Sequence, residues 1–308
     1  MNSKLKFDFA VNKENNTIVV KREFAGDLEL VWKAWTTAEI LDQWWAPEPC
    51  KAETKTMDFR EGGHWLYCMI MPPENKKNWG RQNYEKIVVH KKFSGTDVFC
   101  DENGIANPES PTGRFENVFN EEDGKTLVTI TSTHNSFEEI EMVIEMGFKE
   151  GLASSFENLD KYLSLKNNMK MKRETLKSIG AVIAGFALLV ILSIITDSIL
   201  EKTGIMKTDP FVDNPVWLIA IIILYRTIFN TAGCYLTARL APNKPMKHAI
   251  ILGTIGAVLT IAGLIAMWDT PPHWYPISLI VLTLPAAWFG GQMAIKKEIE
   301  QSRPAIRH

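Results

Sequence analysis

The sequence predicts two domains of different classes. Residues 1–165 combine a series of strand-like segments with a closing amphipathic helix, which predicts an α+β domain whose antiparallel sheet curves around a long C-terminal helix. Residues 176–299 contain four long apolar runs, which predict an all-α bundle of four transmembrane helices. The remaining segments are predicted as a polar linker at 166–175 and a polar tail at 300–308.

Charge supports this division and excludes some functions. The chain has 308 residues with 34 Lys and Arg against 36 Asp and Glu, so its net charge is −2 and we expect no nucleic-acid partner. The net charge is −7 over residues 1–170 and +5 over residues 171–308. The four cysteines form no CxxC pair and the six histidines form no HxH or HxxxH pair. We therefore expect neither a disulfide framework nor a metal site, and no cofactor.

The first domain begins with a strand and two short helices. Thr17–Phe24 is rich in β-branched residues, and Asp27 is a good N-cap for a helix that carries Val31, Trp32 and Trp35. A second short helix is predicted at Ala38–Trp44. Further strands are predicted at Ala52–Arg60, His64–Met71, Trp79–Lys92, Ser94–Asp101, Gly113–Asn120 and Leu127–His134. Hairpin turns are predicted at Glu61-Gly62-Gly63 and Glu122-Asp123-Gly124-Lys125, and a long helix at Ser136–Leu165.

A sheet that wraps one helix leaves an internal space, which is either an apolar ligand cavity or a core filled by the same side chains. Both interpretations stay open. The tryptophan pair Trp44–Trp45 would lie near the mouth, as a hydrophobic plug or as a ligand contact. The candidate cavity residues are Trp35, Trp44, Trp45, Trp65, Tyr67, Met69, Phe115, Phe119, Phe148, Leu152 and Phe156. The polar candidates are Arg81, Tyr84 and Glu85, with Arg81 and Glu85 alternatively an exposed pair on the outer face.

Four runs are long enough to cross a bilayer, which takes about 20 apolar residues in a helix. Eleven Lys and Arg residues flank one set of span ends and two flank the other. The positive-inside rule therefore predicts a multi-pass protein of the cell inner (plasma) membrane with both termini cytoplasmic. The runs are Ser178–Thr196, Val216–Ala238, Ala249–Trp268 and Trp274–Ile295.

One charge lies deep inside a predicted span. Arg226 is near the middle of the second run, where a charge costs about 2.5–3.5 kcal/mol on insertion scales, so it needs a partner or a wet cavity. Asp197 and Asp269 are candidate partners, and Asn230 lies one turn further on the same face. The group is either a structural tie between helices or a polar site for an ion or head group.

Several spaced motifs carry a family resemblance. Their order along residues 17–165 resembles the activator of heat-shock-protein-90 ATPase homologue family of the START-like (SRPBCC) superfamily. The resemblance implies a helix-grip fold with a deep hydrophobic pocket, without implying one activity. It allows a chaperone partner, but no second co-chaperone domain is evident. The motifs are Val31–Thr36, Leu41–Pro47, Phe59–Trp65, Asp97–Gly104 and Met146–Leu159.

These observations predict a membrane-anchored START-like domain that binds an apolar or lipid-like small molecule at the cytoplasmic face, for sensing or regulation. We find no nucleophile elbow, phosphate loop or HExxH motif, and we assign no catalytic residue. Two alternatives remain. One is an enzyme acting in the same pocket, and the other is a small transporter or stress-response membrane protein that the soluble domain regulates.

Overall fold

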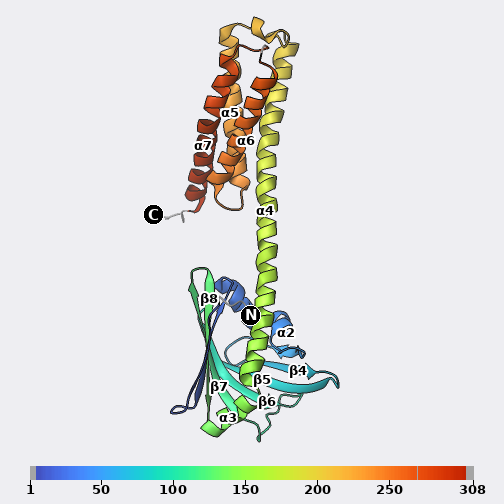
Figure 1. The fold of residues 1–308 in the computed structure, drawn as a ribbon, viewed down its shortest axis with the longest axis vertical. Helices are drawn as coiled ribbons and strands as arrows, with labels where there is room; N and C mark the ends of the chain where they lie inside the picture. Colours follow the sequence, from blue (N-terminus) through green and yellow to red (C-terminus); the bar gives the residue numbers. More distant parts are fainter. Residues whose placement is uncertain (1–4, 269, 303–308) are drawn as a thin grey trace, which may run out of the picture. The chain divides into compact units, whose positions relative to one another are not determined.

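The computed structural model describes residues 5–268 and 270–302. The chain divides into two compact units, residues 1–169 and residues 170–308, which are described separately here (Figure 1).

The first unit is built on one eight-stranded antiparallel sheet in the order β1-β2-β8-β7-β6-β5-β4-β3. The sheet curves around the first part of helix α4, and helices α1 and α2 connect β2 to β3 (Figure 1). The strands are β1 (Phe7–Asn12), β2 (Thr17–Phe24), β3 (Lys51–Met57), β4 (His64–Met71), β5 (Lys76–Val88), β6 (Lys92–Cys100), β7 (Thr112–Glu122) and β8 (Lys125–His134). The helices are α1 (Leu28–Thr36), α2 (Ala38–Trp44), α3 (Phe137–Glu145) and α4 (Phe148–Lys202).

This architecture confirms the predicted class, an α+β helix-grip domain. The predicted N-cap of α1 and the predicted hairpin turn at residues 122–125 are both present. Asp27 accepts a hydrogen bond from the backbone N–H of Leu30 at 2.9 Å and so caps α1. Asp123 and Gly124 both have positive φ, 50° and 72°, as the hairpin turn between β7 and β8 requires.

Three expectations about the elements were wrong. Strand β1 was not predicted, although Phe7–Asn12 pairs with β2 along its whole length. The strand predicted at Trp79–Lys92 is interrupted, because β5 ends at Val88 and β6 begins at Lys92, with His90 in the turn at a φ of 58°. The helix predicted at Ser136–Leu165 is broken at Gly147, whose φ of 83° cannot occur within an α-helix.

The core of the first unit is aromatic and lies between α1, α4 and the sheet. Trp32 makes edge contacts with Phe93 and Phe119, and Phe156 of α4 packs against Phe24. Arg22 on β2 is completely buried, and its Nη2 lies 2.5 Å from Oδ2 of Asp160 on α4. This pair joins the sheet to the helix.

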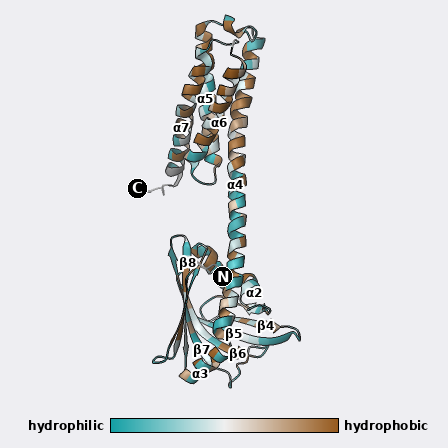
Figure 2. Cartoon of the chain, in the orientation of Figure 1, coloured by the Kyte–Doolittle hydropathy of each residue, from teal (hydrophilic) through white to brown (hydrophobic). Residues whose placement is uncertain are grey.

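The second unit consists of the later part of α4 and three further helices. Within the part of the chain that the structure describes, four helices are long and apolar enough to cross a membrane. Figure 2 shows hydrophobic residues along them. Small residues allow close packing: a Cβ on Gly233 of α5 would lie 2.7 Å from the carbonyl oxygen of Gly185 on α4. The later helices are α5 (Val216–Leu240), α6 (Pro245–Ala266) and α7 (Trp274–Ser302), with a 3-10 turn at Phe211–Asp213.

Residues 166–175, the predicted polar linker, are helical and form part of α4. The Lys, Met, Arg and Glu residues of this segment are good helix formers, and no Gly or Pro interrupts it. The division between the two units, at residues 169 and 170, falls within this segment, and the domain boundaries stay a prediction.

Candidate functional site

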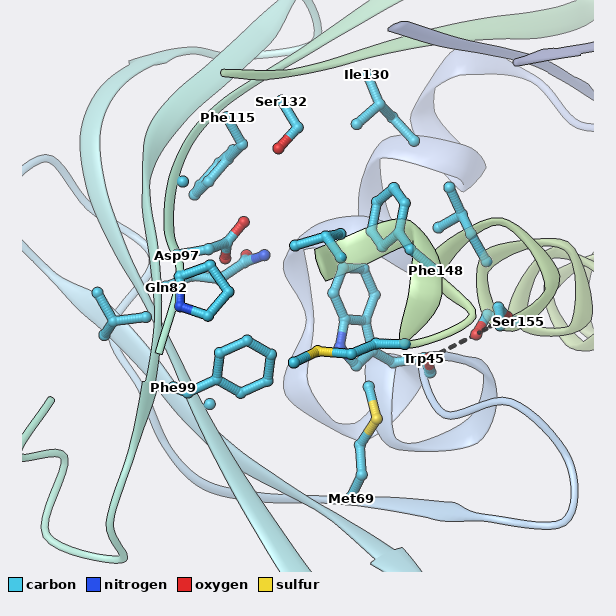
Figure 3. Close-up of a pocket in the computed structure, with 18 of the residues that line it drawn as sticks. Trp45, Met69, Gln82, Asp97, Phe99, Phe115, Ile130, Ser132, Phe148 and Ser155 are labelled. Atoms are coloured by element: carbon cyan, nitrogen blue, oxygen red, sulfur yellow. Dashed lines mark hydrogen bonds between the residues drawn. The ribbon is translucent and has the colours of Figure 1, made fainter. Parts of the chain in front are cut away.

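The first unit contains a cavity of about 410 Å³ between the inner face of the sheet and the helices. Figure 3 shows it from within, with Asp97 and Gln82 on one side and Phe148, Trp45 and Ser155 on the other. Strands β4 to β8 form one wall, and α1, α3, α4 and the loop after α2 form the other. The exposed lining residues Phe99 and Met146 mark where the cavity opens.

Two glycines on the inner face of the sheet help to create this space. Side chains alternate along a strand, so Gly80 of β5 and Gly113 of β7 stand where a side chain would project into the cavity. A Cβ on Gly80 would lie 3.0 Å from the Tyr67 ring, and a Cβ on Gly113 would lie 3.4 Å from the His134 ring. Without side chains at these positions, the neighbouring rings face open volume.

Most of the lining is apolar. Trp45 contacts the rings of Trp65 and Tyr67, with centroids 5.2 Å and 6.0 Å apart. Phe148 and Leu152 approach from α4. Such a surface favours the hydrocarbon or aromatic part of a ligand, because contact with it removes apolar area from water.

The loop that carries Trp45 is fixed to α4 by hydrogen bonds. The Ser155 hydroxyl donates to the Trp45 carbonyl oxygen at 2.8 Å, and the Asn158 amide donates to the Ala46 carbonyl oxygen at 3.1 Å. The backbone N–H of Glu48 donates to the Ser154 hydroxyl at 3.1 Å. The helical wall of the cavity is therefore preorganised.

The sheet wall carries the titratable side chains of the lining. Strand register places Gln82, Asp97, Gly113 and His134 in one row across β5, β6, β7 and β8. His134 Nε2 lies 3.1 Å from the Ser132 hydroxyl. Asn117 Oδ1 and His134 Nδ1 are buried without a hydrogen-bond partner among the described residues. The wall thus offers hydrogen-bonding capacity that the protein leaves unused.

Burial shifts the pKa values of the titratable side chains on this wall. Desolvation raises the pKa of Asp97 to about 7, against a smaller opposing effect of its hydrogen bond with Gln82. Desolvation lowers the pKa of His134, which the nearby Glu139 partly opposes. Burial, with the negative charge of Asp97, raises the pKa of the Tyr67 hydroxyl. Near pH 7 the histidine and the tyrosine are neutral, and Asp97 is close to its midpoint.

The structure divides the predicted cavity residues into two groups. Those that line the cavity are Trp35, Trp45, Tyr67, Met69, Phe115, Phe148 and Leu152. Those that lie in the core instead are Trp44, Trp65, Phe119 and Phe156. Trp44 shows why the pair of tryptophans splits: its indole N–H donates to the buried Ala34 carbonyl at 2.9 Å, so it faces α1. Contact of any of these residues with a ligand stays a prediction.

None of the three polar candidates lines the cavity. Tyr84 is buried in the core beside Phe59 and Phe93. Arg81 donates to the Gly104 carbonyl oxygen at 2.6 Å. Glu85 forms an ion pair with Arg114, so Arg81 and Glu85 have separate partners.

The polar wall was missed at the sequence level. Phe93, Gly95, Asp97 and Phe99 alternate along β6, and that spacing places Asp97 on the same face as two phenylalanines. This signal was available in the sequence. The meeting of Gln82, Asp97 and His134 depends on strand register over more than fifty residues, which local patterns do not encode.

The polar residues of the second unit form a separate group. Arg226 Nη2 lies 2.6 Å from Asp197 Oδ2, and the Tyr225 hydroxyl donates to the same carboxylate. Asn230 donates to the Thr283 carbonyl oxygen at 3.2 Å, on α7. Asp269, the other candidate partner, lies outside the described residues.

The described residues contain no obvious metal-binding site. Within residues 5–268 and 270–302, no three His, Cys, Asp or Glu residues are grouped so that they could hold a metal ion. The four cysteines are free thiols.

Comparisons with solved structures found several similar proteins. Two similar solved structures are 28% identical to this chain: a Mycobacterium smegmatis protein covers 52% of this chain and 96% of its own length, and an Arthrobacter aurescens protein covers 51% and 91%, each with a TM-score of 0.48. A Staphylococcus epidermidis protein is 25% identical, covers 51% of this chain and 94% of its own length, and has a TM-score of 0.46. No curated protein is significantly similar in sequence.

The family model described as Activator of Hsp90 ATPase homolog 1-like protein matches residues 26–164. The match spans strands β3 to β8 and all the residues that line the cavity, and it ends before residue 170, where the second unit begins. The N-terminal domain of this chain therefore belongs to the Activator of Hsp90 ATPase homolog 1-like family.

Proposed function

We propose that the N-terminal domain binds an apolar or amphipathic small molecule in its cavity, while the C-terminal helices anchor the chain in a membrane. The observation that carries this proposal is the cavity itself. Its volume of about 410 Å³ lies in the usual range for small-molecule sites, and it pairs an aromatic lining with a few polar groups on one wall. A core built only for stability would fill this space with side chains.

The membrane part of the proposal rests on four helices of sufficient length and hydropathy. The excess of Lys and Arg at one set of span ends supports cytoplasmic termini in the inner (plasma) membrane. Because both units belong to one chain, anchoring the helices keeps the cavity domain at the cytoplasmic surface. Ligands that partition into lipid are concentrated there.

The proposal is tested by filling the cavity. Gly151 lines it from α4, and a Cβ there would meet nothing closer than Pro47 at 3.9 Å, so Gly151→Trp has room to occupy the volume. Gly180→Trp is the matched control, because it makes the same change on the same helix where a Cβ meets nothing within 4 Å. Small molecules are extracted from each purified full-length variant and identified by mass spectrometry.

We expect the wild type and Gly180→Trp to release the same compound, and Gly151→Trp to release at least ten-fold less of it. Equal release from all three would mean that the compound does not occupy the cavity. If no variant carries a compound and none binds a hydrophobic probe, the binding proposal is wrong.

An enzyme acting in the same cavity is the second candidate, and one observation favours it. Asp97 and His134 both line the cavity, two strands apart in one row with only Gly113 between them. Two titratable groups on one wall are the minimum for general acid–base catalysis. This candidate requires that the compound bound by the wild type be converted over time, and that His134→Gln bind it without converting it.

A further inference from the structure

The cavity contains a single acid and no basic side chain to balance it. Among the described residues that line it, Asp97 is the one carboxylate, and none is Lys or Arg. Besides Asp97 and Tyr67, the titratable lining residue is His134. Burial lowers the pKa of His134, so its ring is neutral at pH 7. A ligand therefore meets negative charge or no charge on this wall.

Neighbouring elements confirm this imbalance around Asp97. Gln82 faces it from β5, Gly113 from β7, and Tyr67 and His134 lie further along β4 and β8. The two arginines on the neighbouring strands β5 and β7 are engaged elsewhere: Arg81 with the Gly104 carbonyl and Arg114 with Glu85. The helices opposite contribute uncharged lining residues, namely Val143, Met146, Phe148, Gly151, Leu152 and Ser155.

The rings around Asp97 suit a positive charge. Phe99 follows it by two residues on the same face of β6, and Phe115 lies on β7, opposite Gly95. Figure 3 shows Phe99 and Phe115 on either side of the Asp97 carboxylate. The face of an aromatic ring attracts cations electrostatically, and a carboxylate between such rings provides the full countercharge.

We propose that the ligand of this cavity is a hydrophobic amine or quaternary ammonium compound. Its cationic head pairs with Asp97, and its apolar part lies against Trp45, Phe148 and Leu152. This inference rests on the proposed function and specifies its ligand class. It disfavours fatty acids and anionic phospholipids when Asp97 is ionised, because their heads would meet a like charge with no basic side chain among the described lining residues to offset it.

The inference carries a pH dependence. Because burial holds the pKa of Asp97 at about 7 in the empty cavity, the carboxylate is ionised above that pH and protonated below it. A permanently charged ammonium binds the ionised form, so its affinity rises with pH through 7. A neutral ligand with the same chain lacks this dependence.

Three probes share a ten-carbon chain and differ in the charge of the head group: decyltrimethylammonium, decanol and decanoate. Comparing them separates the effect of head charge from that of hydrophobicity. Binding is measured by titration calorimetry at pH 8 and pH 5.5, with the full-length protein in phosphatidylcholine nanodiscs. Empty nanodiscs measure partition into lipid, which is subtracted. Asp97→Asn removes the charge with little change of shape, and Glu121→Gln on the exposed end of β7 is the control for loss of one negative charge outside the cavity.

At pH 8 we expect wild type and Glu121→Gln to bind decyltrimethylammonium at least ten-fold more tightly than decanol, which corresponds to about 1.4 kcal/mol. Decanoate should bind most weakly. Asp97→Asn should lose the preference for the ammonium and keep its affinity for decanol, which also shows that the variant is folded. Lowering the pH to 5.5 should weaken ammonium binding to wild type about ten-fold or more.

Equal binding of decanol and decyltrimethylammonium, unchanged in Asp97→Asn, would overturn the cationic ligand and leave the binding function intact. Tightest binding of decanoate would also overturn it. Absence of binding by all three probes would overturn the binding function together with this inference.

Discussion

Asp97 is the residue whose chemistry depends most on the fold around it. In an unfolded chain its carboxyl ionises near pH 4, whereas burial raises its pKa to about 7 in the folded domain. Between these two values the folded state holds a proton that the unfolded state has released. The free energy of unfolding therefore decreases as the pH rises from about 4 to about 7, and the loss is complete above 7.

This linkage predicts that Asp97→Asn stabilises the protein at high pH. Removing an uncompensated buried charge should raise the free energy of unfolding by about 1–3 kcal/mol at pH 8, a range reduced because cavity water partly solvates the carboxylate. At pH 4 most of the difference should disappear, because the folded state is then protonated and the unfolded state is about half protonated. Thermal melts of both proteins at the two pH values measure it, and an equal shift at both would contradict the assignment.

Asp160 differs from Asp97 in having a positively charged partner. It is the partner of Arg22, whose side chain is fully buried, and burial raises the pKa of Asp160 against the opposing charge of Arg22. Asp160→Ala would leave Arg22 buried and unpaired, which costs about 3–5 kcal/mol.

The exposed ion pair of Lys161 and Glu48 is the control for the buried pair of Arg22 and Asp160. Lys161 and Glu48 lie 2.6 Å apart with well-exposed side chains, so Glu48→Ala should change the free energy of unfolding by about 0–1 kcal/mol. Denaturant titration of both variants compares them. Equal losses would show that the Arg22–Asp160 pair is as weak as a surface pair.

At the scale of elements, Gly147 determines where α3 ends and α4 begins. Its φ of 83° is accessible to glycine and strained for alanine, so Gly147→Ala should destabilise the domain by about 1 kcal/mol. Gly180→Ala should instead be neutral or stabilising by up to about 1 kcal/mol, because Gly180 lies within α4 with open space around it. Melting temperatures that move in the same direction for both variants would argue against this boundary.

The elements also show how far the sequence predicts the fold. Thr17–Phe24, Ala38–Trp44 and His64–Met71 have the predicted bounds, because hydrophobic periodicity and flanking turn residues mark both ends. Gly147 and His90 interrupt longer predicted elements because both have positive φ values. A single glycine or histidine in a periodic run does not predict such an interruption. Strand β1 pairs with β2 along its whole length, and the alternation of Phe7, Phe9 and Val11 with polar or small residues was an available signal that the sequence analysis did not use.

The two walls of the cavity also differ in how far the sequence predicts them. Its aromatic wall was predictable in large part, because Tyr67, Phe115 and Phe148 are apolar residues on the inner faces of strands and a helix. Its polar wall was not, because Asp97 and His134 are brought into one row by the pairing of β6, β7 and β8. Sequence patterns indicate which face a side chain occupies, while register decides its neighbours.

At the scale of the whole molecule, the four apolar helices predict an integral membrane protein. The full-length chain should stay with the membrane pellet after alkaline carbonate washing and require detergent for extraction. A fluorescent protein that folds only in the cytoplasm should be bright when fused to either end, as the distribution of Lys and Arg predicts. Recovery in the soluble fraction without detergent would contradict the membrane assignment.

The central claim is that a cavity in a membrane-held domain contains a small molecule, and photo-crosslinking tests it most directly. A photoreactive phenylalanine derivative replaces Phe148, which lines the cavity from α4, in the full-length chain in cells. The cells are irradiated, and the protein is taken from the membrane fraction for mass spectrometry. The account predicts a discrete small-molecule adduct on residue 148, strongly reduced when Gly151→Trp fills the cavity. Membrane-bound protein without an adduct, or an adduct that Gly151→Trp leaves unchanged, would contradict it.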